Sequence, residues 1–289
     1  MKLVLGAAQF GSPYGVTRQA DHVCDGALRG IFADAAALGV FMVDTSPAYG
    51  DSEARLGAAR LDPVLELQTK TRGGTIDLAL DDARADFEQS KRRLGRDSFD
   101  SFLIHSVGQL FTQGGGALLR FLLDLKDKGH ARRIGVSVYD AAQIDRVLEM
   151  FTPDVVQVPL SVADQRLVEN GALRRLKDND VCVQARSVFL QGVLLSEPGA
   201  LSDSVRFLAP HLARFRADAP QASARCFGFL ESTGMVDEVV VGVHSLSQLR
   251  EIAAAMKAPE RGAPWSRFKF PNELVDPRVW PQVSKDLVS

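Results

Sequence analysis

Four side chains that can hold or move a proton stand at the ends of three consecutive strand-like segments. Asp44 ends a short apolar run, and Tyr49 follows it in a turn that contains proline and glycine. Lys70 ends the next strand-like segment, and His105 ends the one after that. Chemistry in parallel α/β sheets and barrels collects at the carboxyl ends of the strands. We therefore expect these four side chains to converge.

The four residue types together suit the donation of a proton to a developing alkoxide. A tyrosine has a pKa near ~10 and is a poor acid at neutral pH. An ammonium group beside the phenol should lower the pKa of Tyr49, and Asp44 should hold Lys70 in place. His105 could orient a substrate carbonyl or share the proton. Hydride reduction of an aldehyde or ketone by a nicotinamide needs such a donor, so the sequence favours a carbonyl reductase with Tyr49 as general acid.

Each of these residues also has a simpler interpretation, and other enzyme classes use similar parts. Taken singly, Asp44 could cap a turn, Tyr49 could pack in its loop, Lys70 could face solvent and His105 could be a core residue. A class I aldolase-type lyase could use Lys70 as its Schiff base, although it would not need the phenol and the imidazole together. A metal-dependent barrel hydrolase needs more His and carboxylate residues at strand ends than the sequence provides. We therefore expect no metal site.

Strand-like and helix-like segments alternate along nearly the whole chain and predict the scaffold for these residues. Eight strands each followed by a helix predict an α/β fold, a (β/α)8 TIM barrel, as a single domain over residues 1–289. An open doubly wound sheet is the lesser alternative. The tail from 265 to 289 should lie over a barrel mouth or flank. The expected strands are 2–9, 41–44, 65–70, 99–105, 133–138, 155–160, 181–187 and 238–243. The expected helices are 24–38, 52–59, 77–94, 117–128, 140–150, 172–178, a broken segment 202–232 interrupted at Pro210 and Pro220, and 246–256.

The bulk composition is that of an ordinary globular protein and argues against polyanionic partners. The chain has 289 residues, 46% hydrophobic and 24% charged, with a formal net charge of −2. This charge argues against a nucleic-acid or membrane-surface partner, and no apolar run is long enough to cross a bilayer. The first residues enter a strand without a cleavage signature, so we expect a cytoplasmic protein. Three widely spaced cysteines fit no disulfide framework or CxxC site, and we expect them to be buried.

The sequence also resembles the aldo-keto reductase superfamily, and in particular a bacterial branch of it. The matches come in chain order at the expected strand ends and cover nearly the whole chain. The resemblance implies the (β/α)8 fold, a small-molecule carbonyl substrate and a catalytic tetrad of Asp44, Tyr49, Lys70 and His105. The segments that carry it are Leu5 to Gly11 with Tyr14 to Val16, Asp44 to Gly50 with Glu53 and Gly57, Gln68 to Lys70, Leu103 to His105, Ile134 to Ser137, Val156 to Pro159, and Gly242 to Gln248.

The resemblance further implies that NADPH binds in an extended pose without a GxGxxG turn, and none follows a strand here. Residues near the ends of strands five to eight would hold it. Arg186 stands where the family often has a ring that stacks on the nicotinamide, and a guanidinium plane can also stack or contact phosphate. The implied ligands are Ser137 and Gln157 for the carboxamide, Arg186, then Ser187, Phe189, Gln191 and Gly192 along the pyrophosphate, and Gly242, His244, Ser245 and Gln248 around the adenosine phosphate.

The chain departs from the family pattern at the ends of the expected cofactor site. His244 replaces the usual cation, while Val138 and Ile252 replace asparagines. A neutral imidazole would bind a 2′-phosphate weakly, so the protein could use NADH as well as NADPH. Since some members of the family sense nucleotides within larger assemblies, a non-catalytic dinucleotide-sensing subunit is a further alternative.

The substrate is not identified by the sequence, because barrel loops select it. The candidate loops are residues 11–19 and 107–115 and the tail around Trp265. Tyr14, Phe111 and Trp265 could line a pocket. The sequence does not predict the oligomeric state.

Overall fold

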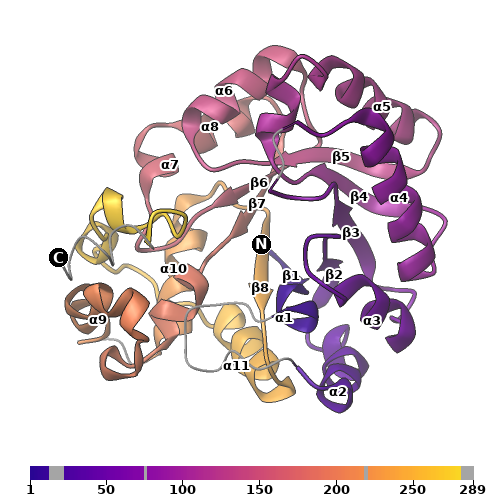
Figure 1. The fold of residues 1–289 in the computed structure, drawn as a ribbon. Coiled ribbons are helices and arrows are strands. Elements are labelled where there is room, and N and C mark those ends of the chain that lie inside the picture. The colour runs from indigo at the N-terminus through magenta and orange to yellow at the C-terminus, as the bar shows by residue number, and fades with distance from the viewer. Residues whose placement is uncertain (13–22, 75–76, 218–220, 281–289) are drawn as a thin grey trace.

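The strands form a closed parallel barrel. The computed structural model describes residues 1–12, 23–74, 77–217 and 221–280. Within these residues eight strands pair in sequence order, and the last pairs with the first, as Figure 1 shows. The predicted (β/α)8 fold is confirmed. The strands are β1 (Lys2–Gly6), β2 (Val40–Asp44), β3 (Glu66–Lys70), β4 (Phe99–Ile104), β5 (Ala131–Ser137), β6 (Val155–Pro159), β7 (Cys182–Arg186) and β8 (Glu238–Gly242).

Helices surround the strands and cover their outer face (Figure 1). They are α1 (Ala8–Gly11), α2 (Asp25–Ala35), α3 (Ser52–Ala59), α4 (Leu80–Leu94), α5 (Gly115–Asp127), α6 (Ala141–Met150), α7 (Arg166–Glu169), α8 (Ala172–Asp178), α9 (Ala209–Arg216), α10 (Ala222–Thr233) and α11 (Leu246–Lys257). Short 3-10 helices are η1 (Val107–Phe111), η2 (Leu190–Leu195), η3 (Pro198–Ala200), η4 (Asp203–Leu208), η5 (Trp265–Phe268) and η6 (Asn272–Leu274). The yellow C-terminal tail lies beside α9 in Figure 1.

The predicted end of the first strand and the predicted helix break at Pro210 were wrong. The first strand ends at Gly6 rather than at Gln9, because the backbone N–H of Phe10 bonds to the carbonyl of Ala7 and starts the short helix α1. Pro210 does not interrupt a helix; it stands in the first turn of α9, where its missing N–H costs nothing. Pro220 lies outside the described residues.

The barrel interior is more polar than the apolar strand sequences suggested. Side chains alternate between the two faces of a strand, so residues two apart share a face. In β8, Val239 and Val241 face the buried helix layer, while Glu238 accepts a hydrogen bond from Gln184 of the adjacent β7 inside the barrel. The hydrophobic core therefore lies between strands and helices, and the inside of the barrel carries hydrogen-bonded polar groups.

Glu53 and Gly57, which belong to the segments that carry the family resemblance, determine how α3 packs against its neighbours. Glu53 in α3 is 1% exposed and accepts hydrogen bonds from Thr69 in β3 and Ser90 in α4. A Cβ at Gly57 would lie 2.0 Å from the carbonyl oxygen of Arg93, so only glycine allows α3 to approach α4 this closely. These contacts hold the helix that follows the Tyr49 loop.

The cysteines differ in environment. Cys226 is buried and Cys182 is half-buried, but Cys24 is exposed at the start of α2. The expectation that all three are buried is wrong, because Cys24 is the N-cap of a surface helix. Among the described residues, no helix combines the length and the apolar character needed to span a bilayer.

Candidate active site

A buried ion pair between Lys70 and Asp44 forms the base of the site. Register pairing sets Asp44 beside Gln68, and Lys70 follows two residues later on the same face of β3. The Nζ atom of Lys70 lies 2.6 Å from Oδ1 of Asp44 and donates to the carbonyl of Thr45 at 3.0 Å. Lys70 is 0% exposed. The ammonium group is therefore neutralised and held below the surface of the site.

The loop after β2 brings the phenol of Tyr49 to the ammonium group. Its hydroxyl oxygen lies 3.5 Å from Nζ of Lys70. The loop is fixed by a close backbone crossing, since a Cβ at Gly11 would lie 1.9 Å from the carbonyl oxygen of Tyr49. Gly50 has a φ of +59° and its Cβ position would meet the carbonyl of Gly11 at 2.2 Å. Glycine at both positions lets α1 pack on the loop that carries the phenol.

The electrostatic environment of the phenol differs from the prediction. The sequence predicted that Lys70 would lower the pKa of Tyr49. In the structure the pKa of Tyr49 is raised, first by burial and then by the charge of Asp44, while Arg186 acts in the opposite direction. Lys70 meets the phenol as a member of a tight ion pair rather than as a lone cation. The phenol therefore keeps its proton at neutral pH, which a proton donor needs.

His105 faces the phenol as a neutral imidazole. Its ring and the ring of Tyr49 lie edge to face with centroids 5.6 Å apart. Burial, followed by the charges of Lys70 and Arg186, lowers the pKa of His105 to about 3. Nδ1 lies 2.9 Å from Oγ of Ser46, which already accepts a hydrogen bond from the N–H of Ala48. We assign the Ser46 proton to the bond with Nδ1, which leaves the imidazole proton on Nε2.

Below the tetrad, glutamines connect opposite strands inside the barrel. Nε2 of Gln68 donates to Asp44 at 2.6 Å and to Oε1 of Gln184 at 2.8 Å. Gln157 donates to the same Oε1 at 2.6 Å. These bonds orient the carboxylate of Asp44 from below, so Lys70 and Gln68 converge on one carboxylate oxygen.

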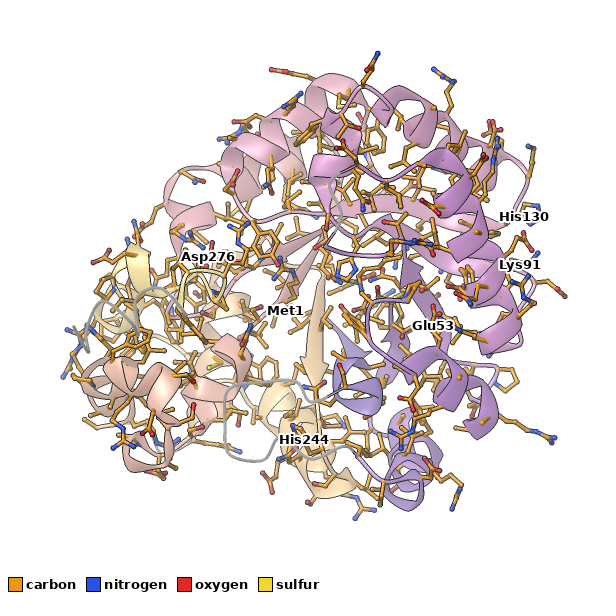
Figure 2. All side chains as sticks on the ribbon, viewed as in Figure 1. Met1, Glu53, Lys91, His130, His244 and Asp276 are labelled. Atoms are coloured by element: carbon orange, nitrogen blue, oxygen red, sulfur yellow. The ribbon has the colours of Figure 1, made fainter. Side chains whose placement is uncertain are left out.

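A cleft of about 730 Å³ runs from the tetrad along the mouth of the barrel to α11. Its size lies in the range of small-molecule and cofactor sites. Asp44 and Tyr49 line its inner end, and His244 lines the far end, where Figure 2 labels it at the start of α11. Of the cofactor residues predicted from the sequence, the structure places these in the cleft: Gln157, Arg186, Ser187, Phe189, Gln191, Gly192, Gly242, His244 and Gln248.

The loop after β7 winds through left-handed backbone conformations beside the cleft. Ser187, Leu190 and Gln191 have φ values of 58°, 47° and 55°, followed by Gly192 at 94°. Non-glycine residues seldom adopt this region and tend to do so at functional sites. Ser187, Gln191 and Gly192 of this loop line the cleft, and their role along a pyrophosphate stays a prediction.

At the far end, the side chains of Ser245 and Gln248 close the first turn of α11. Oγ of Ser245 accepts from the N–H of Gln248 at 3.2 Å, and Oε1 of Gln248 accepts from the N–H of His244 at 2.7 Å. Asp140 and Gln143 cap α6 in the same way. Burial lowers the pKa of His244, so the imidazole is neutral at physiological pH.

Some predicted residues do not line the cleft. Ser137 is 3% exposed at the end of β5, and Ser245 points its hydroxyl at its own helix. Phe111 stacks under the guanidinium of Arg146 at 4.1 Å, and Trp265 packs against Phe229, so neither aromatic residue reaches the cleft. Residues 13–19 of the first candidate loop, Tyr14 among them, lie outside the described residues.

The sequence did not identify the wall that α9 and α10 supply. Arg216, Gln221 and Ser223 line the cleft there, and Glu251 of α11 lines its far end. In the sequence these residues look like ordinary surface residues of helices, so nothing indicated that they line a cleft. In the described part of the chain, no three His, Cys, Asp or Glu side chains gather as a metal site would need.

The chain is similar in sequence to known aldo-keto reductases. A sequence profile of the aldo/keto reductase family matches residues 2–261. An aldo-keto reductase of Mycolicibacterium vanbaalenii is 34% identical over 178 residues, which are 57% of this chain and 60% of the relative. The NADH-specific methylglyoxal reductase of Escherichia coli is 30% identical over 179 residues, 54% of each chain. These matches therefore span little more than half of the curated relatives.

Solved structures show the same fold at low identity. An aldo-keto reductase from Bacillus halodurans in its holo form superposes with a TM-score of 0.70 at 19% identity, covering 99% of this chain and 91% of that one. An aldo/keto reductase from Brucella melitensis gives a TM-score of 0.63 at 18% identity, with 94% of both chains covered. With a profile match over most of its length and a barrel of the same architecture, the chain belongs to the aldo/keto reductase family.

Proposed function

We propose that the protein reduces an aldehyde or ketone to an alcohol with a nicotinamide cofactor. The observation that carries this proposal is the meeting of Tyr49, Lys70, Asp44 and His105, of which Asp44 and Tyr49 line the inner end of one long cleft. The bound cofactor would supply the hydride. The protein would bind the carbonyl, hold it against the proton donor and exclude water.

In this proposal Tyr49 is the general acid. Its phenol stays protonated in the resting site because burial, reinforced by Asp44, raises its pKa. As negative charge develops on the carbonyl oxygen, the phenol donates its proton to that oxygen. Lys70, held by Asp44, stabilises the charge left on the phenol. The neutral His105 donates a hydrogen bond from Nε2 to the same carbonyl oxygen and orients it.

The residues around the cleft fit an extended dinucleotide. The proposed ligands are those implied by the resemblance. Gln157 and Arg186 line the cleft, Ser137 lies buried at the end of β5 beside Gln157, and the others follow the loop after β7 and the start of α11. The β7 loop offers the clearest fit, because its left-handed backbone turns Ser187, Gln191 and Gly192 toward the cleft.

The charges at the far end favour NADH over NADPH. His244 stays neutral, Glu251 adds negative charge, and Arg216 forms an ion pair with Glu197 at 2.5 Å. A 2′-phosphate would meet no free cation among these groups, whereas Glu251 suits a ribose hydroxyl. The Escherichia coli relative is an NADH-specific methylglyoxal reductase, which supports this choice. We propose that both nucleotides bind and that NADH binds more tightly.

The lyase alternative needs a lysine that a substrate can reach. Lys70 is fully buried and its Nζ atom is paired with Asp44 at 2.6 Å, so it is poorly placed to attack a carbonyl. Borohydride treatment in the presence of substrate should therefore leave Lys70 unmodified; trapping on Lys70 would support the lyase instead. The expected cytoplasmic location and single domain stay predictions.

The proposed function is tested in two steps with the whole chain. Titration with NADH and NADPH, followed by nucleotide fluorescence, should show binding of both and tighter binding of NADH. Addition of small aldehydes such as methylglyoxal or benzaldehyde should then consume the reduced nucleotide. Nucleotide binding without turnover of any aldehyde or ketone would favour a sensing subunit, and no binding of either nucleotide would contradict the proposal.

A further inference from the structure

Arg186 ends β7 beside the groups that the proposed function places at the reacting carbonyl. Its side chain lines the cleft together with Asp44 and Tyr49. Burial and Asp44 raise the pKa of Tyr49, and the charge of Arg186 opposes them. Burial and Lys70 lower the pKa of His105, and Arg186 acts in the same direction. The guanidinium is thus close enough to influence both proton-bearing side chains.

The guanidinium group is held in place but keeps donors for a ligand. Its Cζ atom lies 4.3 Å from the centroid of the Tyr139 ring. One N–H donates to the carbonyl of Val138 at 3.1 Å, and another lies 3.4 Å from Oγ of Ser187. A guanidinium has about five N–H donors. Among the described residues no further acceptor contacts this group, so the remaining donors can bind a ligand without rearrangement.

Among the described residues, Arg186 differs from the arginines near it because it forms no ion pair with a carboxylate. A small cavity at the same mouth is lined by Tyr139, Arg186, Arg166 and the carboxylates Asp164 and Asp276. Asp164 pairs with Arg166 at 2.8 Å. Asp276, labelled in Figure 2 near the C-terminal tail, pairs with Arg278 at 2.5 Å. Each neighbouring arginine is neutralised, whereas no carboxylate in the described ranges forms an ion pair with Arg186.

An ordered, unneutralised guanidinium at a cleft is suited to bind an anion, because its fork matches the two oxygens of a carboxylate. We propose that Arg186 binds a carboxylate on the carbonyl substrate, so that the enzyme reduces aldehydes or ketones that carry an acid group. This inference rests on the proposed function, since it requires the carbonyl to lie at Tyr49 and His105.

The nucleotide pyrophosphate is the other anion that could reach this arginine. Two observations favour the substrate. Arg186 ends β7 and lines the cleft at the carboxyl ends of the strands, where Asp44 ends β2 and Tyr49 follows it. The left-handed turn at Gln191 and Gly192, farther along the loop, already offers the pyrophosphate a backbone approach.

The inference is tested with substrates that differ only in charge. Rates are compared for 4-formylbenzoate, 3-formylbenzoate and phenylglyoxylate, each beside its methyl ester. The wild type should show kcat/KM at least about 10-fold higher for the acids than for the esters. Arg186→Gln should lower the acid-to-ester ratio by about 30-fold. Arg186→Lys, which keeps the charge without the fork, should give an intermediate ratio. The dissociation constants of NADH and NADPH are measured for each variant as well, because the resemblance also implies a contact between Arg186 and the cofactor.

The outcomes separate this inference from the proposed function. Equal turnover of acids and esters by the wild type would overturn the carboxylate site and leave the reductase standing. Weaker nucleotide binding in Arg186→Gln, with an unchanged acid-to-ester ratio, would assign the arginine to the cofactor and also overturn the inference. Thermal unfolding of each variant shows whether the fold is intact, and the ester rates provide an internal reference for general damage.

Discussion

The inside of the barrel contains a buried ion pair at each end, and only one of them adjoins the cleft. At the carboxyl end Lys70 pairs with Asp44 at 2.6 Å, and at the amino end Arg133 pairs with Glu238 at 2.7 Å. The two pairs belong to one hydrogen-bond network, because Gln68 links Asp44 to Gln184, and Gln184 donates to Glu238 at 2.7 Å.

The neighbours of the two pairs differ in kind. Around Lys70 stand a phenol, a neutral imidazole and an open cleft. Around Arg133 stand Ser101 at 3.0 Å and the sulfur atoms of Met42 and Cys182, both at 3.7 Å. The neighbours of Lys70 include groups that can donate a proton to a ligand, whereas the neighbours of Arg133 close the amino end of the barrel. A buried ion pair can assist proton transfer to a ligand only where proton donors and an open cleft lie beside it.

The largest expected effect is on turnover when the proton donor is removed. Tyr49→Phe should lower kcat by about 10³-fold, since general acid catalysis contributes on that order. Nucleotide affinity and thermal stability should be nearly unchanged, because the lost hydroxyl has only a 3.5 Å contact with Lys70. Steady-state kinetics and nucleotide titration measure both quantities. A variant with wild-type kcat would remove Tyr49 from the mechanism.

Breaking each ion pair in turn tests the difference between the two ends. Lys70→Met and Arg133→Met both leave a buried carboxylate without its partner, which costs about 3–5 kcal/mol for a fully buried pair. We expect the smaller loss for Arg133, whose side chain is 17% exposed. Only Lys70→Met should also lower kcat, by about 10²-fold. Chemical denaturation and kinetics are measured on the same samples; an equal loss of kcat in folded Arg133→Met would contradict the comparison.

The neutral state of His105 predicts how stability depends on pH. The unfolded chain protonates this imidazole near pH ~6.5, whereas the folded pKa is about 3. Its contribution to stability is therefore complete above the unfolded pKa and is lost as the pH falls from there toward about 3. The maximum slope is about 1.4 kcal/mol per pH unit.

His105→Asn isolates this contribution, because all other acids titrate alike in both proteins. The free energy of unfolding of the wild type should fall more steeply than that of the variant between about pH 6 and about pH 4. Parallel curves would show that the imidazole is charged in the folded state. The wild-type rate should show no step from His105 over the same interval.

The smallest expected effect concerns the serine that orients the imidazole. Ser46→Ala removes the 2.9 Å contact with Nδ1 and lets the imidazole change tautomer. We expect a drop in kcat/KM of about threefold to tenfold and a stability loss of about 1 kcal/mol. Ser106→Ala is the matched control, since this serine follows His105 in the chain and, among the described residues, its hydroxyl contacts only the N–H of Gly74 at 3.4 Å. Equal rates in both variants would show that Ser46 does not position His105.

Much of the scaffold could be predicted because it follows from local pattern. The alternation of strands and helices gave the barrel, and the period of two along β3 already places Gln68 and Lys70 on one face. The polar interior was missed although the sequence of β7, with Gln184 and Arg186 alternating with smaller residues, contained its signal. The wall at Arg216 and Ser223 could not be predicted, because its helices reach the cleft only through the path of the chain.

By itself the sequence determined which side chains stand at which strand ends, since strand order and side-chain alternation are local properties. The tertiary structure alone decided how their charges combine. Asp44 neutralises Lys70, so burial raises the pKa of the phenol against expectation. Asp276, far along the chain, pairs with its near neighbour Arg278, and no carboxylate in the described ranges forms an ion pair with Arg186. Electrostatic energies depend on distances through space, and folding sets those distances between residues that are remote in sequence.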